Sequence, residues 1–222
     1  MNKYIQELEN AYAQHANPQI AGDQSAYLKN LFPFIGLKTP VRRDAQKPLL
    51  AKANLPSKEE AFTIAKTLWS KPEREYHYFA QELLQKYKRQ FEVSDLTLFE
   101  YMASHNSWWD SVDIIAVKLI GEYFKKFPAE IKPNINKWLH SGNMWLQRCA
   151  ILFQLHYKQG IDTEILTHVI NSLLGSDEFF INKAIGWILR EYGKTNPEWV
   201  LDFVDKTDLH PLSRREAIRR LV

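Results

Sequence analysis

The stretch LQRCA, residues 146–150, places an arginine two positions before a closing alanine, inside a longer helical pattern. Related stretches recur along the chain: VRRDA ending at Ala45, YHYFA ending at Ala80, INKA ending at Ala184 and RREA ending at Ala217. Together with Ala150, successive members are 35, 70, 34 and 33 residues apart. The gap of 70 is twice the others, and WDSVD, ending at Asp113, divides it into 33 and 37 residues. The chain therefore contains six units of similar length.

Each unit has the pattern of two helices. Apolar residues recur at spacings of three and four in EEAFTIAKTLW, YFAQELLQKY, DIIAVKLIGEYF and WLQRCAILFQL, and alternating strand patterns are missing. Stretches with Pro, Gly, Ser or Asp separate about a dozen such segments. Units of this length built from two helices are typical of α-solenoids, and the lack of a TPR consensus favours the HEAT-like kind. We expect an all-α fold of about six helical pairs, forming one curved domain over residues 1–222 with a concave basic groove.

Composition sets wider limits on the protein class. The 222 residues are 45% hydrophobic and 25% charged, as in an ordinary soluble globular protein. Cys149 is the single cysteine, which suits a reducing compartment. The polar start MNKYIQELEN has no signal-peptide pattern, and no apolar run approaches the roughly 18 residues of a membrane span. We expect a cytoplasmic protein that does not contact membranes.

Basic residues recur in register with the repeat. Arg43, Arg148 and Arg215 each lie two positions before the aligned alanine, and Lys183 lies one position before it. Equivalent positions in a solenoid line up along one surface, so these residues are expected to form a cationic stripe that suits an extended polyanion. The net charge of +3 permits such a partner without requiring one. The alternative is that the basic residues are only solvated helix faces.

One repeat carries a carboxylate where the others carry alanine. Trp109 lies four residues before Asp113 and shares its helix face, while Trp187 follows Ala184 by three. These three side chains, with Arg148, are predicted to face one groove. A carboxylate between indole faces can stabilise a cation. Taken singly, a tryptophan with this pattern is more often a core residue than a functional one, and Asp113 could equally be the salt-bridge partner of Arg148.

Other chemistries lack their motifs. The seven histidines show no HExxH or similar ligand spacing, so no metal is expected. There is no GxGxxG, no GxxxxGK[ST] and no nucleophile elbow, so we expect no cofactor. We assign Trp108 and Cys149 to the core.

The sequence resembles the AlkD-type DNA glycosylases, the HEAT-like-repeat family of DNA alkylation repair enzymes. The resemblance covers essentially the whole chain. It is carried by NPQIAGDQSAYLKNLFPFIGLKTPVRR (residues 17–43), SWWDSVD (107–113), WLQRCAILFQLHYKQ (145–159), EFFINKAIGWILREYGKTNP (178–197) and LSRREAI (212–218).

The resemblance implies a DNA repair enzyme that hydrolyses the N-glycosidic bond of cationic alkylated purines, N7-alkylguanine and N3-alkyladenine, in duplex DNA, with the lesion left stacked. Asp113 matches the catalytic aspartate, and Trp109 and Trp187 match the tryptophans that flank it. Arg148 matches a DNA-contacting arginine, and Tyr27 matches a residue that meets the minor groove. The full set expected to bind DNA is Arg148, Tyr27, Lys38, Arg43, Lys183 and Arg190.

The sequence departs from the family pattern at two positions. Lys38 and Asn182 each stand where glutamine is expected; Lys38 could alter DNA affinity. The segment QIAGDQSAYLKNLF retains the second helix, whose loss accompanies loss of activity in some relatives. We therefore expect an active, monomeric enzyme. The alternative is a non-catalytic HEAT-like module that binds nucleic acid or protein.

Overall fold

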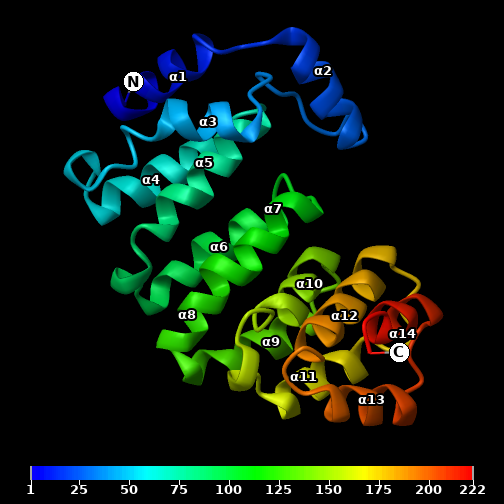
Figure 1. Ribbon diagram of the computed structural model, residues 1–222. Helices are drawn as coiled ribbons and strands as arrows, with labels where there is room; N and C mark the ends of the chain where they lie inside the picture. Colours follow the sequence, from blue (N-terminus) through cyan, green and yellow to red (C-terminus); the bar gives the residue numbers. More distant parts are fainter. Residues whose placement is uncertain (1, 222) are drawn as a thin grey trace. The chain divides into compact units, whose positions relative to one another are not determined.

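The structure is a computed structural model that describes residues 2–221, and within this range it contains helices and no strands (Figure 1). The chain divides into two compact units, Met1–Phe91 and Glu92–Val222. The α-helices of the first unit are α1 (Lys3–Ala13), α2 (Pro18–Tyr27), α3 (Thr39–Gln46), α4 (Lys58–Trp69) and α5 (Arg74–Gln85). The second unit contains α6 (Leu96–Ser104), α7 (Trp109–Ile114), a π-helix (Ile115–Ile120), α8 (Gly121–Lys126), α9 (Ile131–Leu139), α10 (Met144–Leu152), α11 (Thr163–Ser172), α12 (Phe179–Tyr192), α13 (Pro197–Lys206) and α14 (Pro211–Ile218). The expectation of a single domain over residues 1–222 stays a prediction.

Helix starts in both units follow local capping signals. Asn17 caps α2 by accepting from the N–H of Ile20, and α2 begins with a proline. Ser57 and Glu60 form a capping box at the start of α4. In the second unit the side chains of Asn143 and Asp162 cap α10 and α11 by accepting hydrogen bonds from backbone N–H groups of the first turn. These caps explain why helices begin where the sequence places Ser, Asn or Asp before an apolar pattern.

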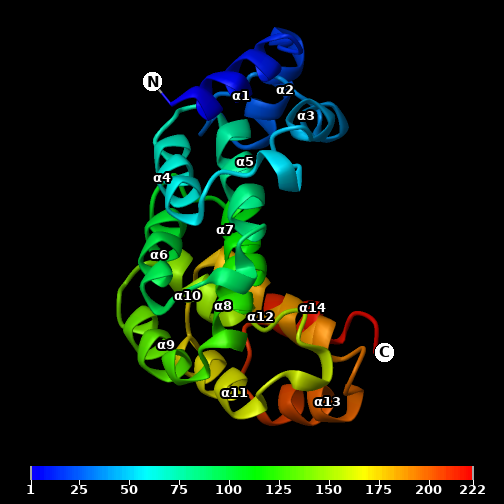
Figure 2. The same ribbon diagram turned by 90° about the vertical axis from the view of Figure 1, so that its left-hand side faces the viewer.

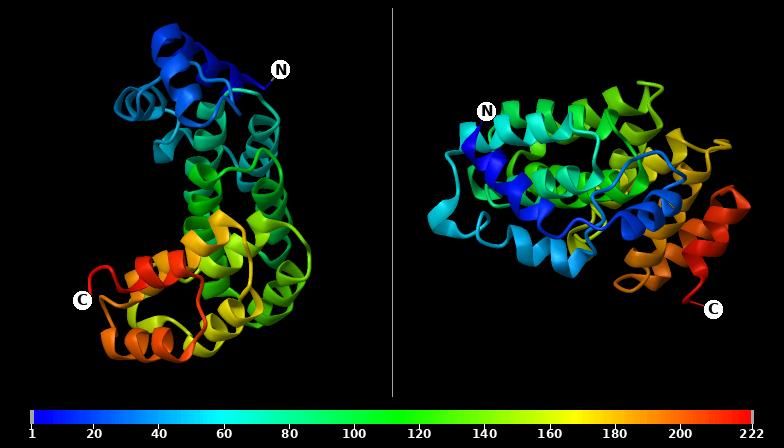
Figure 3. Two further views of the ribbon diagram at one scale, coloured as in Figure 1. Left: turned by 90° about the vertical axis from the view of Figure 1, so that its right-hand side faces the viewer. Right: turned by 90° about the horizontal axis from the view of Figure 1, so that it is seen from above.

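In the first unit α1 packs on α3, and α4 packs along α5 (Figure 3). The core between them includes the fully buried side chains of Leu8, Tyr12, Leu68, Trp69 and Phe79. Helix α2 differs from the others because it buries no side chain. Its position must therefore come from polar contacts.

Those contacts hold the segment that follows α2. The buried Glu75 carboxylate accepts three consecutive backbone N–H groups, from Ile35 at 3.0 Å, Gly36 at 2.9 Å and Leu37 at 3.1 Å. The N–H of Asn17, the α2 cap, donates to the Ile35 carbonyl at 3.1 Å. Gly36 has φ +97°, and a Cβ there would lie 2.0 Å from the Asn17 carbonyl oxygen. The N-terminal end of α2 is thus tied to a segment that Glu75 anchors, and only glycine fits at position 36.

The second unit is built from helical pairs. α9 packs on α10, α13 packs on α14, and α6 packs on α7 and the π-helix that continues it. α12 packs on both α10 and α14, so the second helices of successive pairs form one layer (Figure 1). α9 and α11 pack on each other and, with α13, cover this layer from the other side (Figure 2). The alternation of inner and outer helices is that of an α-solenoid, and the predicted all-α solenoid fold is confirmed.

The aligned repeat positions each fall within an α-helix. They lie on α3, α5, α7, α10, α12 and α14 in turn, as Ala45, Ala80, Asp113, Ala150, Ala184 and Ala217. Four of the five alanines are buried and Ala45 is partly buried. Alanine recurs because these helices pack closely there. Asp113 therefore places a carboxylate at a depth where other repeats bury a methyl group.

Candidate active site

A pocket of about 330 Å³ lies on the second unit. Side chains from α7, α10, α12 and α14 line it, and two of them come from the start of α12. They are Trp109, Asp113, Arg148, Phe179, Phe180, Lys183, Trp187, Arg190 and Glu216. The three side chains predicted to be catalytic, Asp113, Trp109 and Trp187, are thus brought to one pocket with three of the predicted DNA-binding residues.

Asp113 and Arg148 form a bidentate ion pair at the floor of this pocket. Arg148 donates from Nε to Asp113 Oδ1 at 2.7 Å and from Nη2 to Oδ2 at 3.0 Å. A third donor, Nη1, bonds to the Phe180 carbonyl. The side chains are 14% and 5% exposed, respectively. Asp113 is therefore the salt-bridge partner of Arg148, as one of the two alternatives predicted. It also lines the pocket, as the other alternative requires.

Burial dominates the electrostatics of Asp113. Loss of water raises the pKa of its carboxyl above the ordinary value, and Asp110 adds to this, while the hydrogen bonds and charge of Arg148 work in the opposite direction. Each carboxylate oxygen accepts one bond from Arg148 and keeps a further acceptor site. Asp113 can therefore accept a hydrogen bond from a water or substrate group that enters the pocket.

The helix that carries Asp113 changes its winding directly after it. α7 ends at Ile114, and Ile115–Ile120 are π-helical before α8 resumes the α-helix. A π-helix takes up more residues per turn than an α-helix, and such segments are frequent at functional sites. This wider winding lies between Asp113 and Ala150, where the repeat is longest at 37 residues.

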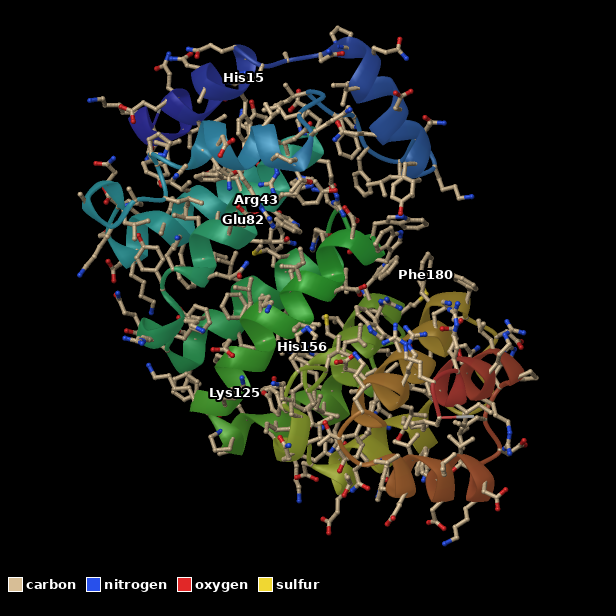
Figure 4. All side chains as sticks on the ribbon, viewed as in Figure 1. His15, Arg43, Glu82, Lys125, His156 and Phe180 are labelled. Atoms are coloured by element: carbon tan, nitrogen blue, oxygen red, sulfur yellow. The ribbon has the colours of Figure 1, made fainter. Side chains whose placement is uncertain are left out.

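Aromatic rings surround the ion pair. Trp109 and Trp187 are half-buried. Next to them Trp108, Trp145 and Phe180 form a three-ring cluster with centroids 5.0–5.7 Å apart. Trp108, expected in the core, is half-buried in this cluster rather than fully enclosed. Of this cluster only Phe180 lines the pocket, and Trp108 and Trp145 pack against it at the start of α12, where Phe180 lies (Figure 4).

The two predicted cations of α12 share one carboxylate. Lys183 Nζ lies 3.0 Å from Glu216 Oε1, and Arg190 Nη1 pairs with Glu216 Oε2. Hydrogen bonding and charge from Lys183, and then from Arg190, hold the pKa of the Glu216 carboxyl below its usual value. Glu216 is thus ionised at neutral pH.

Arg215, predicted to belong to the cationic stripe, is exposed on α14 and does not line the pocket. The remaining predicted DNA-binding residues belong to the first unit. Tyr27 is 71% exposed at the end of α2, and Lys38 is exposed immediately before α3. Arg43 is exposed and lies 3.6 Å from Glu82, which Figure 4 shows beside it. The neighbouring Arg42 is buried and pairs with the same Glu82 at 2.8 Å.

Glu216, Phe179 and Phe180 line the pocket and were not predicted. Glu216 could have been found from the repeat, because it lies one position before Ala217, as Lys183 lies one position before Ala184. Opposite charges at equivalent positions of adjacent repeats predict an ion pair. The two phenylalanines carry no comparable signal.

Two further observations concern cofactors and surroundings. Among residues 2–221 no three His, Cys, Asp or Glu side chains gather in a way that could hold a metal ion. Over the same range no helix has the length and apolar character of a bilayer span.

Cys149 is buried beside the ion pair, and burial raises the pKa of its thiol, so the thiol stays protonated at neutral pH.

Helical pairs with a carboxylate, two tryptophans and several cations in one pocket define an α-solenoid protein with the features of an active site. The sequence model of the DNA alkylation repair enzyme family matches residues 8–221. A solved structure described as a predicted DNA alkylation repair enzyme from Enterococcus faecalis is 33% identical to this chain. The similarity covers 93% of this chain and 97% of that one, with a TM-score of 0.87. No curated protein sequence matches the chain.

The chain belongs to the DNA alkylation repair enzyme family. Membership implies an enzyme of DNA repair with DNA as its substrate.

Proposed function

We propose that the protein is an AlkD-type DNA glycosylase of base excision repair. Its substrates would be N7-alkylguanine and N3-alkyladenine in duplex DNA, and its reaction the hydrolysis of their N-glycosidic bond. The observation that carries this proposal is the Asp113 carboxylate, which lines one pocket with Trp109 and Trp187. We propose that it acts as a monomer.

The chemistry of the substrate explains why this pocket suffices. An alkylated purine of this class carries a positive charge, so it leaves as a neutral base when the glycosidic bond breaks and takes the bonding electrons with it. No acid is needed to protonate the leaving group. The positive charge moves instead to the sugar, which becomes oxocarbenium-like, and a preorganised negative charge stabilises that state.

Asp113 is suited to this role by its surroundings. Its carboxylate is mostly buried, so its field is less screened by water than on an exposed surface. The acceptor sites left free by Arg148 can orient a water for attack on the sugar carbon, after which the water's proton passes to the carboxylate or to solvent. The faces of Trp109 and Trp187 add a cation–π contribution.

The cations would hold the DNA backbone near this pocket. Lys183 and Arg190 lie on the pocket wall, and Arg148 retains N–H groups beyond the three it donates internally. Tyr27, Lys38 and Arg43 are exposed in the first unit, where they are available to a duplex. The charges of Lys38 and Arg43, with those at the pocket, would supply the salt-dependent part of the affinity.

The rival function is a non-catalytic module that binds nucleic acid or protein. The bidentate Asp113–Arg148 pair favours it, because such a pair gives Asp113 a structural role without chemistry. This rival does not account for the two tryptophans and the acceptor sites that face the same pocket.

Base release from methylated duplex DNA distinguishes the two functions. Purified protein would be incubated, in molar excess, with a duplex that carries 7-methylguanine. Free base would be measured by chromatography and compared with a protein-free control. Release above the control rate is expected. A protein that binds the duplex but leaves the release rate unchanged would support the binding module instead.

A further inference from the structure

Glu216 is the one charged residue lining this pocket whose role the proposed reaction leaves open. It reaches across from α14 to both cations of α12, at 3.0 Å from Lys183 and in direct hydrogen bond with Arg190. Its side chain is 12% exposed, whereas those of Lys183 and Arg190 are 38% and 21% exposed. The carboxylate is therefore enclosed while the two cations keep access to solvent.

The helix geometry places this triad around Trp187. Lys183, Trp187 and Arg190 follow a spacing of four and three residues, so they share one face of α12, on which position 187 lies between the other two along the helix. Any positive charge held against the Trp187 face is therefore close to both of them. A cationic transition state at this position would be repelled by two uncompensated cations.

Close packing of α12 on α14 brings Glu216 to this face. A Cβ on Gly186 would lie 2.5 Å from Glu216 Cβ and 2.9 Å from the Ser213 carbonyl oxygen. The buried Ser213 hydroxyl donates to the Asn182 carbonyl at 2.9 Å, which fixes the register of the two helices. The absence of a side chain at Gly186 thus lets α14 present Glu216 to the pocket.

The charges of the pocket can be counted by pairs. The pair of Asp113 and Arg148 adds no net charge to this count, while Lys183 and Arg190 together exceed Glu216 by one positive charge. One excess positive charge attracts a phosphate and leaves little repulsion toward a cationic sugar. Without Glu216 the excess would be two.

We propose that Glu216 is a positioning and charge-compensating residue of this pocket. It holds Lys183 and Arg190 against α14 and cancels one of their charges, so that the wall beside Trp187 attracts DNA without opposing the cation formed in the reaction. This inference rests on the proposed glycosylase function for its effect on rate, but its effect on DNA binding is independent of catalysis.

The test is Glu216→Gln, measured in two ways. On unmethylated duplex DNA the variant should bind more tightly, and its slope of log affinity against log salt should steepen by up to about 0.9 for each cation released to a phosphate. On methylated duplex its single-turnover rate of 7-methylguanine release should fall about tenfold, because the added positive charge opposes the oxocarbenium-like sugar. Tighter binding with slower chemistry is a combination that loss of structure does not produce.

Two companion variants separate charge from shape. Lys183→Gln combined with Glu216→Gln restores the net charge, so most of the lost rate and the wild-type salt slope should return. Glu216→Asp keeps the charge and should retain the wild-type slope, which keeps the inference testable if Glu216→Gln folds poorly. Glu191→Gln is the matched control, since Glu191 also lies on α12 but pairs with Lys194 and does not line the pocket. Its salt slope and rate should stay at wild-type values.

The outcomes are distinct. A folded Glu216→Gln protein with the salt slope of Glu191→Gln overturns the inference, as does a charge-restored double variant as slow as the single one. A wild-type protein that releases no base would refute the glycosylase proposal alone, because the salt slopes would still decide the role of Glu216.

Discussion

Replacing Arg148 by methionine tests how the Asp113 carboxylate is held. Methionine keeps an unbranched chain in place of the aliphatic part of arginine but lacks the guanidinium. The change therefore removes three internal hydrogen bonds, two to Asp113 and one to the Phe180 carbonyl. Asp113 would remain as a carboxylate that is mostly buried and has lost its cation. Removing one partner of a buried ion pair costs about 3–5 kcal/mol. Because Asp113 keeps some exposure, we expect a loss near the lower figure, about 3 kcal/mol.

The pH dependence of this loss identifies its cause. Burial already raises the pKa of Asp113, and without the opposing guanidinium the folded-state pKa should rise further. A carboxyl with a raised folded-state pKa destabilises the protein fully above that pKa, and the destabilisation is relieved as pH falls through it. The destabilisation relative to wild type should therefore shrink as the pH falls from 8 toward 4 through the raised pKa, by about 1.4 kcal/mol for each unit of additional pKa shift.

Urea unfolding followed by tryptophan fluorescence measures both quantities. Lys206→Met is the matched control, because Lys206 and Asp202 also pair at 2.7 Å but are 72% and 61% exposed. Its cost should be below about 0.5 kcal/mol at either pH. A loss for Arg148→Met that matches this control, or one that is the same at pH 8 and pH 4, would refute the account of Asp113 as a buried carboxylate stabilised by Arg148.

Three further predictions concern rate and stability. Because burial raises the pKa of Asp113, the single-turnover rate, corrected for protein-free release, should fall as the pH drops toward that raised pKa; a rate unchanged down to pH 4 would contradict this. Trp109→Ala and Trp187→Ala should each slow base release less than Asp113→Asn, since a cation–π contact contributes about 0.5–2 kcal/mol; a larger loss in either would make the indoles the main stabilising groups. Gly36→Ala should lower the free energy of unfolding by more than about 1 kcal/mol and speed amide exchange in α2, because its Cβ would meet the Asn17 carbonyl. Gly22→Ala is the control: its Cβ would meet nothing within 4 Å, so neither quantity should change in this direction.

Much of the fold was predictable from the repeat. The recurring alanine marks the positions where helices pack closely, so its spacing located a helix in every unit. The same alignment placed Asp113 at a buried depth and predicted its partnership with Arg148 as one of two alternatives. Local capping residues then set the helix starts.

Long-range polar contacts were less predictable. The Glu75 contact with residues 35–37 depends on a loop conformation that has no periodic pattern, so α2 could be predicted as a helix but not its anchoring. The π-helix after Asp113 likewise has no signature in the apolar spacing. The repeat did place Lys183 and Glu216, which carry opposite charges, at equivalent positions, but their contact forms only when α12 packs on α14.

The most direct test of the central claim is Asp113→Asn on a single preparation, with single-turnover release of 7-methylguanine and melting temperature measured together. The substitution is nearly isosteric but removes the negative charge that we propose faces the sugar. We expect a folded protein that binds methylated duplex and releases base about a hundredfold more slowly, which corresponds to about 3 kcal/mol of lost transition-state stabilisation. A variant with a lower melting temperature but wild-type release by its folded fraction would contradict the claim and leave Asp113 as only the structural partner of Arg148.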